Sequence, residues 1–256
     1  MFRRWRLSEL ESGRWDDAAV RQRVAPNIAA LVDHNILVAR WVASEIVLTG
    51  ANTKRRVKTL TYFVDLAEAC RALCNFNGMF AIFVGLGHPA IRRLEATHKA
   101  LSRAVQQRHH ALEELCSESG NFRAYRSVLA AASQPLVPIA MPLLRAVATN
   151  QEVATPDGAP KMDTLRALAG AYRAVLDARR TPYAFKRSPQ LQALLQHGLV
   201  TTTTSLARVM ELSNICEPPL DAVASVVAGV AALQTSSPIT PRLTSTGSRV
   251  GRQSRT

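Results

Sequence analysis

The chain has 256 residues, of which 47% are hydrophobic, so it can bury a sizeable core and is too apolar for a disordered segment. Only 5% of the residues are aromatic while alanine and leucine are plentiful, a composition that favours helices over strands. The net charge of +13 favours acidic or phosphate-rich partners: nucleic acid, anionic lipid or an acidic protein. We therefore expect an all-α protein.

The number of cysteines and the hydropathy of the chain indicate the cellular compartment in which the protein is expected. There are four cysteines and no secretory leader at the start, which indicates a reducing intracellular environment without a disulfide framework. The longest uncharged apolar stretch, residues 222–233, is shorter than the roughly 20 residues that a membrane span needs. We expect a cytoplasmic protein, with peripheral membrane contact still open.

Apolar residues at helical spacing predict helices along most of the chain. The first, over residues 26–48, begins with Pro26 and is so rich in apolar residues that we expect it to be central. Further helices are expected at residues 52–74, 79–86, 102–115, 122–132, 139–149, 162–180, 189–198 and 220–234. Proline and glycine within 155–160 predict a turn between two of these helices, which would make them a hairpin.

The helix expected after Asn52 begins with four bases, although the N-terminal end of a helix prefers anions. These bases are Lys54, Arg55, Arg56 and Lys58. A conflict of this kind between local preference and sequence indicates a function at that surface, whereas the simpler reading is a solvated helix face.

Metal and catalytic motifs are weak. Cys70 and Cys74 lie one helical turn apart, but a zinc site needs four ligands, so we interpret them as buried free thiols. His109 and His110 stand near acids at 113–114 on a polar helix, and we interpret them as surface residues. The chain has no nucleophile elbow, Walker lysine or glycine-rich phosphate loop, so neither a hydrolase nor a kinase is supported. We expect no metal and no cofactor.

Seven short sequence blocks stand in a fixed order along residues 7–195. They are LSEL at 7–10 with Trp15; APNI at 25–28 with ARWV at 39–42; KRRV at 54–57 with CNFNGM at 74–79; GL at 85–86 with PAI at 89–91 and RL at 93–94; NFRAYR at 121–126; VP at 137–138; and TPY at 181–183. In this order they resemble the catalytic domain of the Ras-family guanine-nucleotide exchange factors, the RasGEF domain, without its usual first helix.

The resemblance implies a single helical domain with a protruding helical hairpin. It implies a helical bowl that takes up one switch region of a Ras-family small GTPase of Ras, Rap or Ral type. The hairpin, residues 143–183, would displace the other switch and disturb the phosphate and magnesium site. Such a protein promotes GDP release without covalent chemistry, and no nucleic acid is expected as a partner.

The resemblance also implies site residues. Glu152 falls where the family places an acid near the magnesium site, and Ala148 falls on its apolar intruder. The GTPase-binding residues are expected to be Arg56, Asn75, Asn77, Met79, Arg145 and Arg166. The two asparagines are also expected to cap helices.

The hairpin departs from the family pattern. Pro142 stands within its leading helix, residues 149–151 read TNQ where acids are expected, and Ala148 is small for an apolar intruder. These departures motivate an alternative: an inactive RasGEF-like scaffold that binds a GTPase or adaptor. A third reading is a basic helical module that binds nucleic acid or an anionic membrane, the latter through residues 3–6, which include Arg4 and Trp5.

The domain organisation that we expect has four parts. They are a basic N-terminal segment at 1–6, a RasGEF-like catalytic domain at 7–198, a helical extension at 199–234 and a disordered basic tail at 235–256.

Overall fold

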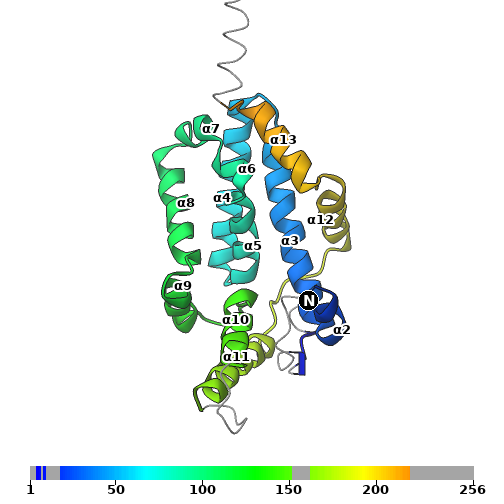
Figure 1. Ribbon diagram of the computed structural model, residues 1–256, viewed down its shortest axis with the longest axis vertical. Helices are drawn as coiled ribbons and strands as arrows, with labels where there is room; N and C mark the ends of the chain where they lie inside the picture. Colours follow the sequence, from blue (N-terminus) through cyan, green and yellow to red (C-terminus); the bar gives the residue numbers. More distant parts are fainter. Residues whose placement is uncertain (1–3, 7, 10–17, 152–161, 220–256) are drawn as a thin grey trace, which may run out of the picture. The chain divides into compact units, whose positions relative to one another are not determined.

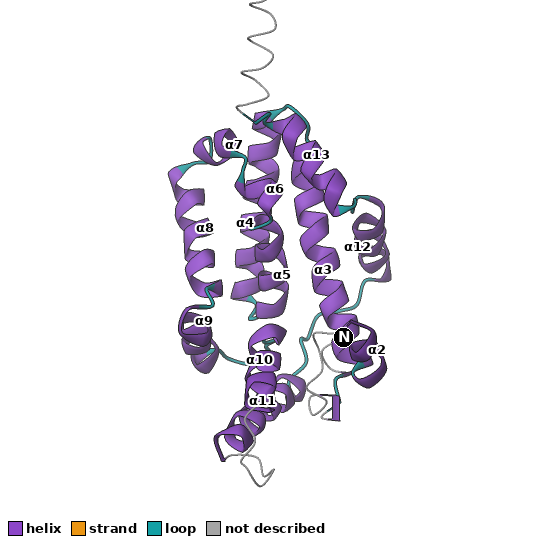
Figure 2. Cartoon of the chain, viewed as in Figure 1, coloured by secondary structure: helices purple, strands orange, loops and turns teal. Residues whose placement is uncertain are grey.

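A computed structural model of the protein describes residues 4–6, 8–9, 18–151 and 162–219. Contacts divide the chain into a unit Met1–Glu217 and a unit Pro218–Thr256, and every helix described lies in the first. Its described residues form helices and no β-strand, as Figure 2 shows, which confirms the all-α prediction. The expected turn at 155–160, the helix at 220–234 and the tail at 235–256 lie outside the described residues.

The helices follow one another along the chain with short connections. They are α2 (Ala18–Val24), α3 (Pro26–Val47), α4 (Thr53–Ala72), α5 (Phe76–Leu86), α6 (Pro89–Arg92), α7 (Glu95–Lys99), α8 (Arg103–Cys116), α9 (Ser119–Ala131), α10 (Ala140–Gln151), α11 (Met162–Arg180), α12 (Pro189–Thr201) and α13 (Leu206–Cys216). Every predicted helix up to residue 198 is present. Four helices, α2, α6, α7 and α13, were not predicted.

Helix α3 is central, as predicted, and packs against α4, α5 and α13 (Figure 1). Its first turn is held by a distant acid: a carboxylate oxygen of Glu9 accepts hydrogen bonds from the backbone amides of Asn27 (2.9 Å) and Ile28 (3.1 Å). Free amides at a helix start need such an acceptor because they have no partner within the helix. The LSEL block therefore has a structural purpose: its acid caps the central helix.

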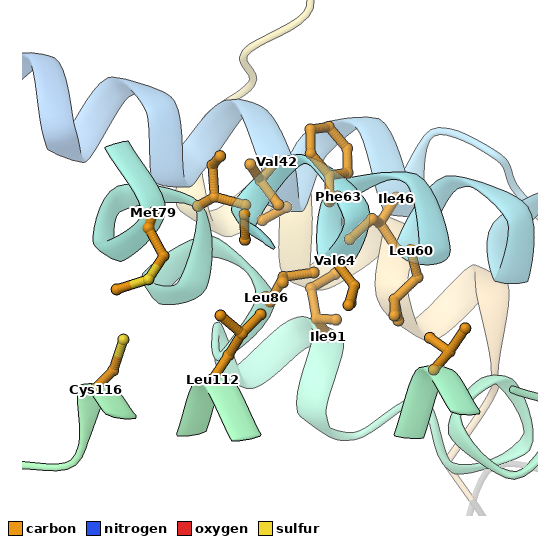
Figure 3. Packing of buried hydrophobic residues seen from close by; sticks show 14 of the residues in the cluster. Val42, Ile46, Leu60, Phe63, Val64, Met79, Leu86, Ile91, Leu112 and Cys116 are labelled. Carbon is orange, nitrogen blue, oxygen red and sulfur yellow. The ribbon is translucent and has the colours of Figure 1, made fainter. Parts of the chain in front are cut away.

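The main core lies between α3, α4, α5 and α8. Figure 3 shows Val42 and Ile46 of α3 facing Phe63 and Val64 of α4, with Leu112 of α8 on the far side. All five are almost completely buried. Burying side chains of this size stabilises the fold by about 1.5–3 kcal/mol each.

One glycine sets the distance between α3 and α5. A β-carbon added at Gly85 would lie 2.5 Å from the carbonyl oxygen of Ala39 and 2.7 Å from Cβ of Val42. Neither backbone nor a β-branched side chain can move aside cheaply there, so only glycine allows the two helices to approach this closely.

The turn between α4 and α5 has a defined geometry. Cys74 adopts a left-handed backbone conformation (φ +55°), which ends α4 and redirects the chain. Asn75 then caps α5, and its side-chain oxygen accepts a hydrogen bond from the amide of Gly78 over 3.0 Å. The expectation that this asparagine caps a helix is confirmed. We refer to residues 73–77 as the junction.

The break expected between the predicted helices at 102–115 and 122–132 is partly present. Helix α9 begins at Ser119, but Gly120, Asn121 and Phe122 all have positive φ, so the regular helix resumes only after them. Phe122 is 1% exposed, and burial of its ring offsets the cost of a conformation that bulky residues rarely adopt.

Helix α13 closes the end of the unit at which α4 begins. Its residue Val209 is fully buried in the main core, and the hydroxyl of Ser213 donates to the carbonyl of Ala90 over 2.6 Å. Ser205 caps the helix by accepting a hydrogen bond from the amide of Arg208. Residues 206–216 therefore pack into the helical body.

Candidate functional site

Helices α10 and α11 form the predicted hairpin. They pack against each other and extend beyond the lower ends of α3 and α5 in Figure 1. The base of the hairpin is buried: Leu144 and Val175 belong to a second apolar cluster together with Ile28 of α3 and Trp5. Further out, Met162 and Leu165 of α11 are 62% and 44% exposed. The hairpin therefore has an anchored base and an apolar, accessible outer part.

The first foot of the hairpin, the segment before α10, is attached to the junction. The amide of Val137 donates to the carbonyl of Cys74 (2.9 Å), and the amide of Asn77 donates to the carbonyl of Val137 (3.2 Å). Two residues on, the amide of Ile139 donates to the hydroxyl of Tyr125 over 2.8 Å. Burial raises the pKa of Tyr125, so the hydroxyl stays neutral and remains available for this bond.

The second foot, which follows α11, returns to the same place. The hydroxyl of Tyr183 donates to the carbonyl of Leu73 over 2.6 Å, and its ring stacks on Phe185 with centroids 5.5 Å apart. Both ends of the hairpin are thus tied to residues 73–77. A displacement of the junction would be transmitted to both feet.

Beside the junction lies a hollow of about 420 Å³ between α3 and α5. Its lining comprises Leu31, His34, Asn35, Val38, Trp41, Asn75, Asn77, Gly78, Ala81, Ile82 and Val137. Across it the side chains of Asn35 and Asn77 form a reciprocal amide pair, with N to O distances of 3.1 and 2.8 Å. Each amide satisfies the other, and Asn77 is 5% exposed, so it lies in the floor of the hollow.

A second hollow, of about 780 Å³, lies between α3 and α12. It shares His34, Val38 and Trp41 with the first, so the two hollows flank one stretch of α3. Its rim carries the basic side chains of Arg4 and Arg187. We call the two hollows together the docking face, because they form a concave, mainly apolar surface with polar groups in its floor and bases at its edge.

The predicted site residues are not all on this face. Asn75 and Asn77 line it, whereas Met79 is fully buried in the main core beneath it. Ala148 lies within α10, the helix of the hairpin that was expected to carry it. Glu152 lies outside the described residues.

The basic residues that were predicted to bind a GTPase also lie in different parts of the structure. Arg145 on α10 lies over the ring of Phe122 (5.7 Å) and makes a salt bridge of 2.6 Å with Glu118, while Arg166 is exposed on α11. Arg56 has no exposed surface. Its contact with a GTPase stays a prediction, and its position favours an internal role.

The bonds of Arg56 define that internal role. Its guanidinium donates to the hydroxyl of Thr97 (2.7 Å), to the carbonyl of Gly50 and to the carboxylate of Glu217 (3.2 Å). Glu217 also accepts from the amides of Ala96 and Thr97. Burial alone would raise the pKa of Glu217, but these hydrogen bonds and the Arg56 charge outweigh it and lower that pKa.

Several residues of the site and its support escaped sequence reasoning. Asn35 was not considered as a site residue. It follows His34 and interrupts an otherwise continuous apolar stripe on its helix, and this interruption is the signal that could have indicated it. Glu217 was overlooked because its partner is 161 positions away. Trp5, which the third reading placed at an anionic membrane, is 1% exposed, so its side chain is not available as an interfacial anchor.

The cysteines show no catalytic activation. Burial raises the pKa of Cys70, and it raises that of Cys116 to about 12, so both are neutral thiols at physiological pH. Within the described ranges, no group of three or more histidine, cysteine or acidic side chains could hold a metal ion. None of the helices described combines the length and apolarity that a membrane crossing requires.

Residues 1–165 match the RasGEF domain family, which covers the junction, the first hollow and the leading helix of the hairpin. The chain belongs to the RasGEF family. The RasGEF resemblance drawn from the seven blocks is confirmed, and the junction with its attached hairpin is the region in which the blocks at 74–79, 137–138 and 181–183 meet.

Relatives of this RasGEF domain are named Ras or Rap guanine nucleotide exchange factors. It is 28% identical to Ras guanine nucleotide exchange factor P of Dictyostelium discoideum over 201 residues, 77% of this chain and 13% of that protein. It is 34% identical to a Rap guanine nucleotide exchange factor of Caenorhabditis elegans over 56% of the chain and 10% of that protein. It is 38% identical to human Rap guanine nucleotide exchange factor 6 over 39% of the chain and 6% of that protein. The chain thus spans a small part of each relative.

Proposed function

We propose that this RasGEF domain promotes the release of GDP from a Ras-family small GTPase of Ras, Rap or Ral type. In this proposal the GTPase docks on the face formed by α3, α5 and α12, and the α10–α11 hairpin reaches its phosphate and magnesium site. The observation that carries the proposal is that the floor of the docking face and both feet of the hairpin share the junction at 73–77.

This sharing matters because exchange requires coupling between binding and release. A protein shifts a nucleotide equilibrium only as far as it binds the emptied GTPase better than the loaded one. If the nucleotide is held with picomolar affinity, about 16 kcal/mol must be offset. A broad apolar surface can supply such an interaction, and a hairpin fixed at that surface can direct it toward the phosphate pocket.

The docking face has the composition of an interface core. Trp41, Val38 and Ile82 provide apolar contact, and the Asn35–Asn77 pair offers two amides for backbone recognition. Interfaces of this kind gain most of their affinity from a few aromatic and well-packed residues near the centre. Trp41 is shared by both hollows and is therefore the expected anchor.

The test is release of a fluorescent GDP analogue from Ras, Rap and Ral proteins, with EDTA as the positive control for release. The purified chain should accelerate release from at least one of them in proportion to its concentration. Failure with all three, by a sample whose helical content and cooperative melting are intact, would overturn the proposal.

The departures in the hairpin support a second candidate, a RasGEF-like scaffold that binds without promoting exchange. Helix α10 carries Pro142 and the small Ala148. The scaffold predicts saturable binding of a GTPase in a pull-down or calorimetric titration together with unchanged nucleotide release. It also predicts that Glu152→Ala leaves that binding unaltered.

A further inference from the structure

We propose that this chain has a second interaction surface, separate from the docking face, that binds the phosphate-rich surface of an anionic membrane. The surface, which we call the basic end, consists of Lys54, Arg55 and Lys58 on α4, Arg103 at the start of α8 and the exposed apolar residue Leu48. The inference does not depend on exchange activity.

The basic end is held together by the buried guanidinium of Arg56. This group donates to the carbonyl of Gly50, in the loop that follows Leu48, and to the hydroxyl of Thr97 on α7, the helix that precedes α8. The end of α3, the start of α4 and α7 therefore meet at one end of the unit, opposite the hairpin in Figure 1. The bonds of Arg56 thus hold these three segments together.

The charge of the basic end is not neutralised by its own carboxylates. Lys54, Arg55, Lys58 and Arg103 are exposed, and none has a carboxylate within 4.0 Å among the residues that the structure describes. Two acids at this end already have partners, since Glu95 pairs with Lys99 and Glu217 with Arg56. The surface therefore attracts anions over roughly a Debye length of about 8 Å.

The position of these bases is unfavourable for the helix itself. Asn52 caps α4 by accepting a hydrogen bond from the amide of Arg55. Glutamate at the position of Arg55 would complete a capping box, and an acid in place of Lys54 would interact favourably with the positive end of the helix dipole. Bases in these places reduce stability, so their charge serves something other than the fold.

A membrane fits this surface better than nucleic acid does. Leu48 is 50% exposed and lies in the turn adjoining the bases, which is the arrangement of an apolar side chain that enters the headgroup region between cationic residues. Single-stranded nucleic acid is bound by several aromatic platforms, whereas Tyr62, one turn after Lys58 on α4, is the one exposed aromatic side chain near these bases among the described residues. The docking face is formed by the middle of α3, so both surfaces can be occupied at once.

The experiment is co-sedimentation of the full chain with phosphatidylcholine vesicles that contain or lack phosphatidylserine. The chain should bind the anionic vesicles, lose binding as salt is raised and ignore the neutral ones. The double variant Lys54→Glu/Arg55→Glu should bind about 25-fold more weakly or worse, because each base near an anionic surface strengthens binding about fivefold. Its melting temperature should equal or exceed that of the wild type.

Matched controls distinguish vesicle binding by the basic end from a general effect of the positive charge of the chain. The variant Arg71→Glu/Arg123→Glu makes the same change of charge at exposed positions distant from the basic end, and it should retain vesicle binding. A chain without residues 235–256 tests the arginine-rich segment and should retain most of the binding. If Lys54→Glu/Arg55→Glu melts early, the exposed pair Lys58→Glu/Arg103→Glu provides the same test outside the first turn of α4.

Three results would overturn the inference. The first is wild-type vesicle binding by both charge-reversed pairs, and the second is complete loss of binding when 235–256 alone is removed. The third is a loss of duplex DNA binding by the charge-reversed pairs while their vesicle binding is unchanged, which would assign the surface to nucleic acid.

Discussion

The guanidinium of Arg56 lies 3.2 Å from a carboxylate oxygen of Glu217, and the arginine side chain is completely buried. The pair joins the start of α4 to the residue that follows α13. It also fixes α7, because Glu217 accepts hydrogen bonds from the amides and hydroxyl at its start. A buried charge needs such a partner, since an uncompensated one is costly in a medium of low polarity.

Replacing Glu217 with alanine should lower the free energy of unfolding by about 3 kcal/mol, because Arg56 would remain buried without its carboxylate. Urea denaturation measures the change. Glu217→Gln should cost less, since its amide oxygen still accepts from the α7 amides. A loss for Glu217→Ala that equals that of an exposed control such as Glu211→Ala would contradict a buried ion pair.

The same pair predicts a dependence of stability on pH. The pKa of Glu217 is lowered in the folded protein, so its contribution to stability is complete above the pKa of the unfolded chain and is lost as pH falls through the folded value. As pH falls below the unfolded value of about 4.3, the difference in unfolding free energy between wild type and Glu217→Gln should therefore shrink, whereas between pH 7 and pH 5 it should stay constant. A difference that grows on acidification would reverse the assigned direction of the shift.

Asn77→Ala should reduce the catalytic efficiency of exchange, kcat/KM, by about tenfold, because a hydrogen bond to a docked partner contributes roughly 0.5–1.5 kcal/mol and Asn35 loses its own partner as well. Nucleotide-release kinetics over a range of chain concentrations give this value. The control Gln107→Ala changes an exposed amide on α8 and should have no effect. Equal rates for Asn77→Ala and the wild type would remove the amide pair from the proposed interface.

Two glycines should respond in opposite ways to substitution by alanine. Gly85→Ala forces a β-carbon against Ala39 and Val42 and should destabilise the fold by about 1–3 kcal/mol. At Gly198, inside α12, an added β-carbon meets nothing within 4 Å, so Gly198→Ala should stabilise by up to about 1 kcal/mol. Thermal melts of both variants measure these changes in stability. A Gly85→Ala protein as stable as the wild type would mean that α3 and α5 are not in close contact.

Ala148→Leu should increase the rate of nucleotide release, because it supplies the larger apolar side chain that the family pattern places at this point of the hairpin. Exchange kinetics and GTPase affinity should be measured together, since the scaffold alternative predicts no gain in rate. As a control, Ala104→Leu makes the same substitution on an exposed face of α8. A gain seen equally with the control would show that position 148 has no special part in exchange.

The fold could be predicted from local signals that coincide with its physical causes. Pro26 starts α3, Asn52 and Ser102 cap α4 and α8, and apolar residues recur at helical spacing between them. Helix α13 was not predicted, although Ser205 marks its start and Val209 and Cys216 lie on its buried side. The short α6 and α7 lack the length at which periodicity becomes visible.

The candidate site was less predictable, because its residues come together only through tertiary contacts. The sequence blocks identified Asn75 and Asn77, but nothing local indicates that Asn35 is their neighbour or that Tyr183 bonds to Leu73. Arg56 illustrates the opposite error. Its three exposed basic neighbours suggested a surface residue, while its own side chain turns inward to an acid far along the chain.

Helix α13 has a consequence for the order of events during synthesis. The ribosome delivers Arg56 long before Glu217, so the nascent chain must hold an arginine that has no carboxylate waiting for it. Contacts between distant segments also slow folding, since a long loop must close before they form. The contacts of α13 and Glu217 with the helical body can therefore form only after residue 217 has left the ribosome, long after α4 has been synthesised.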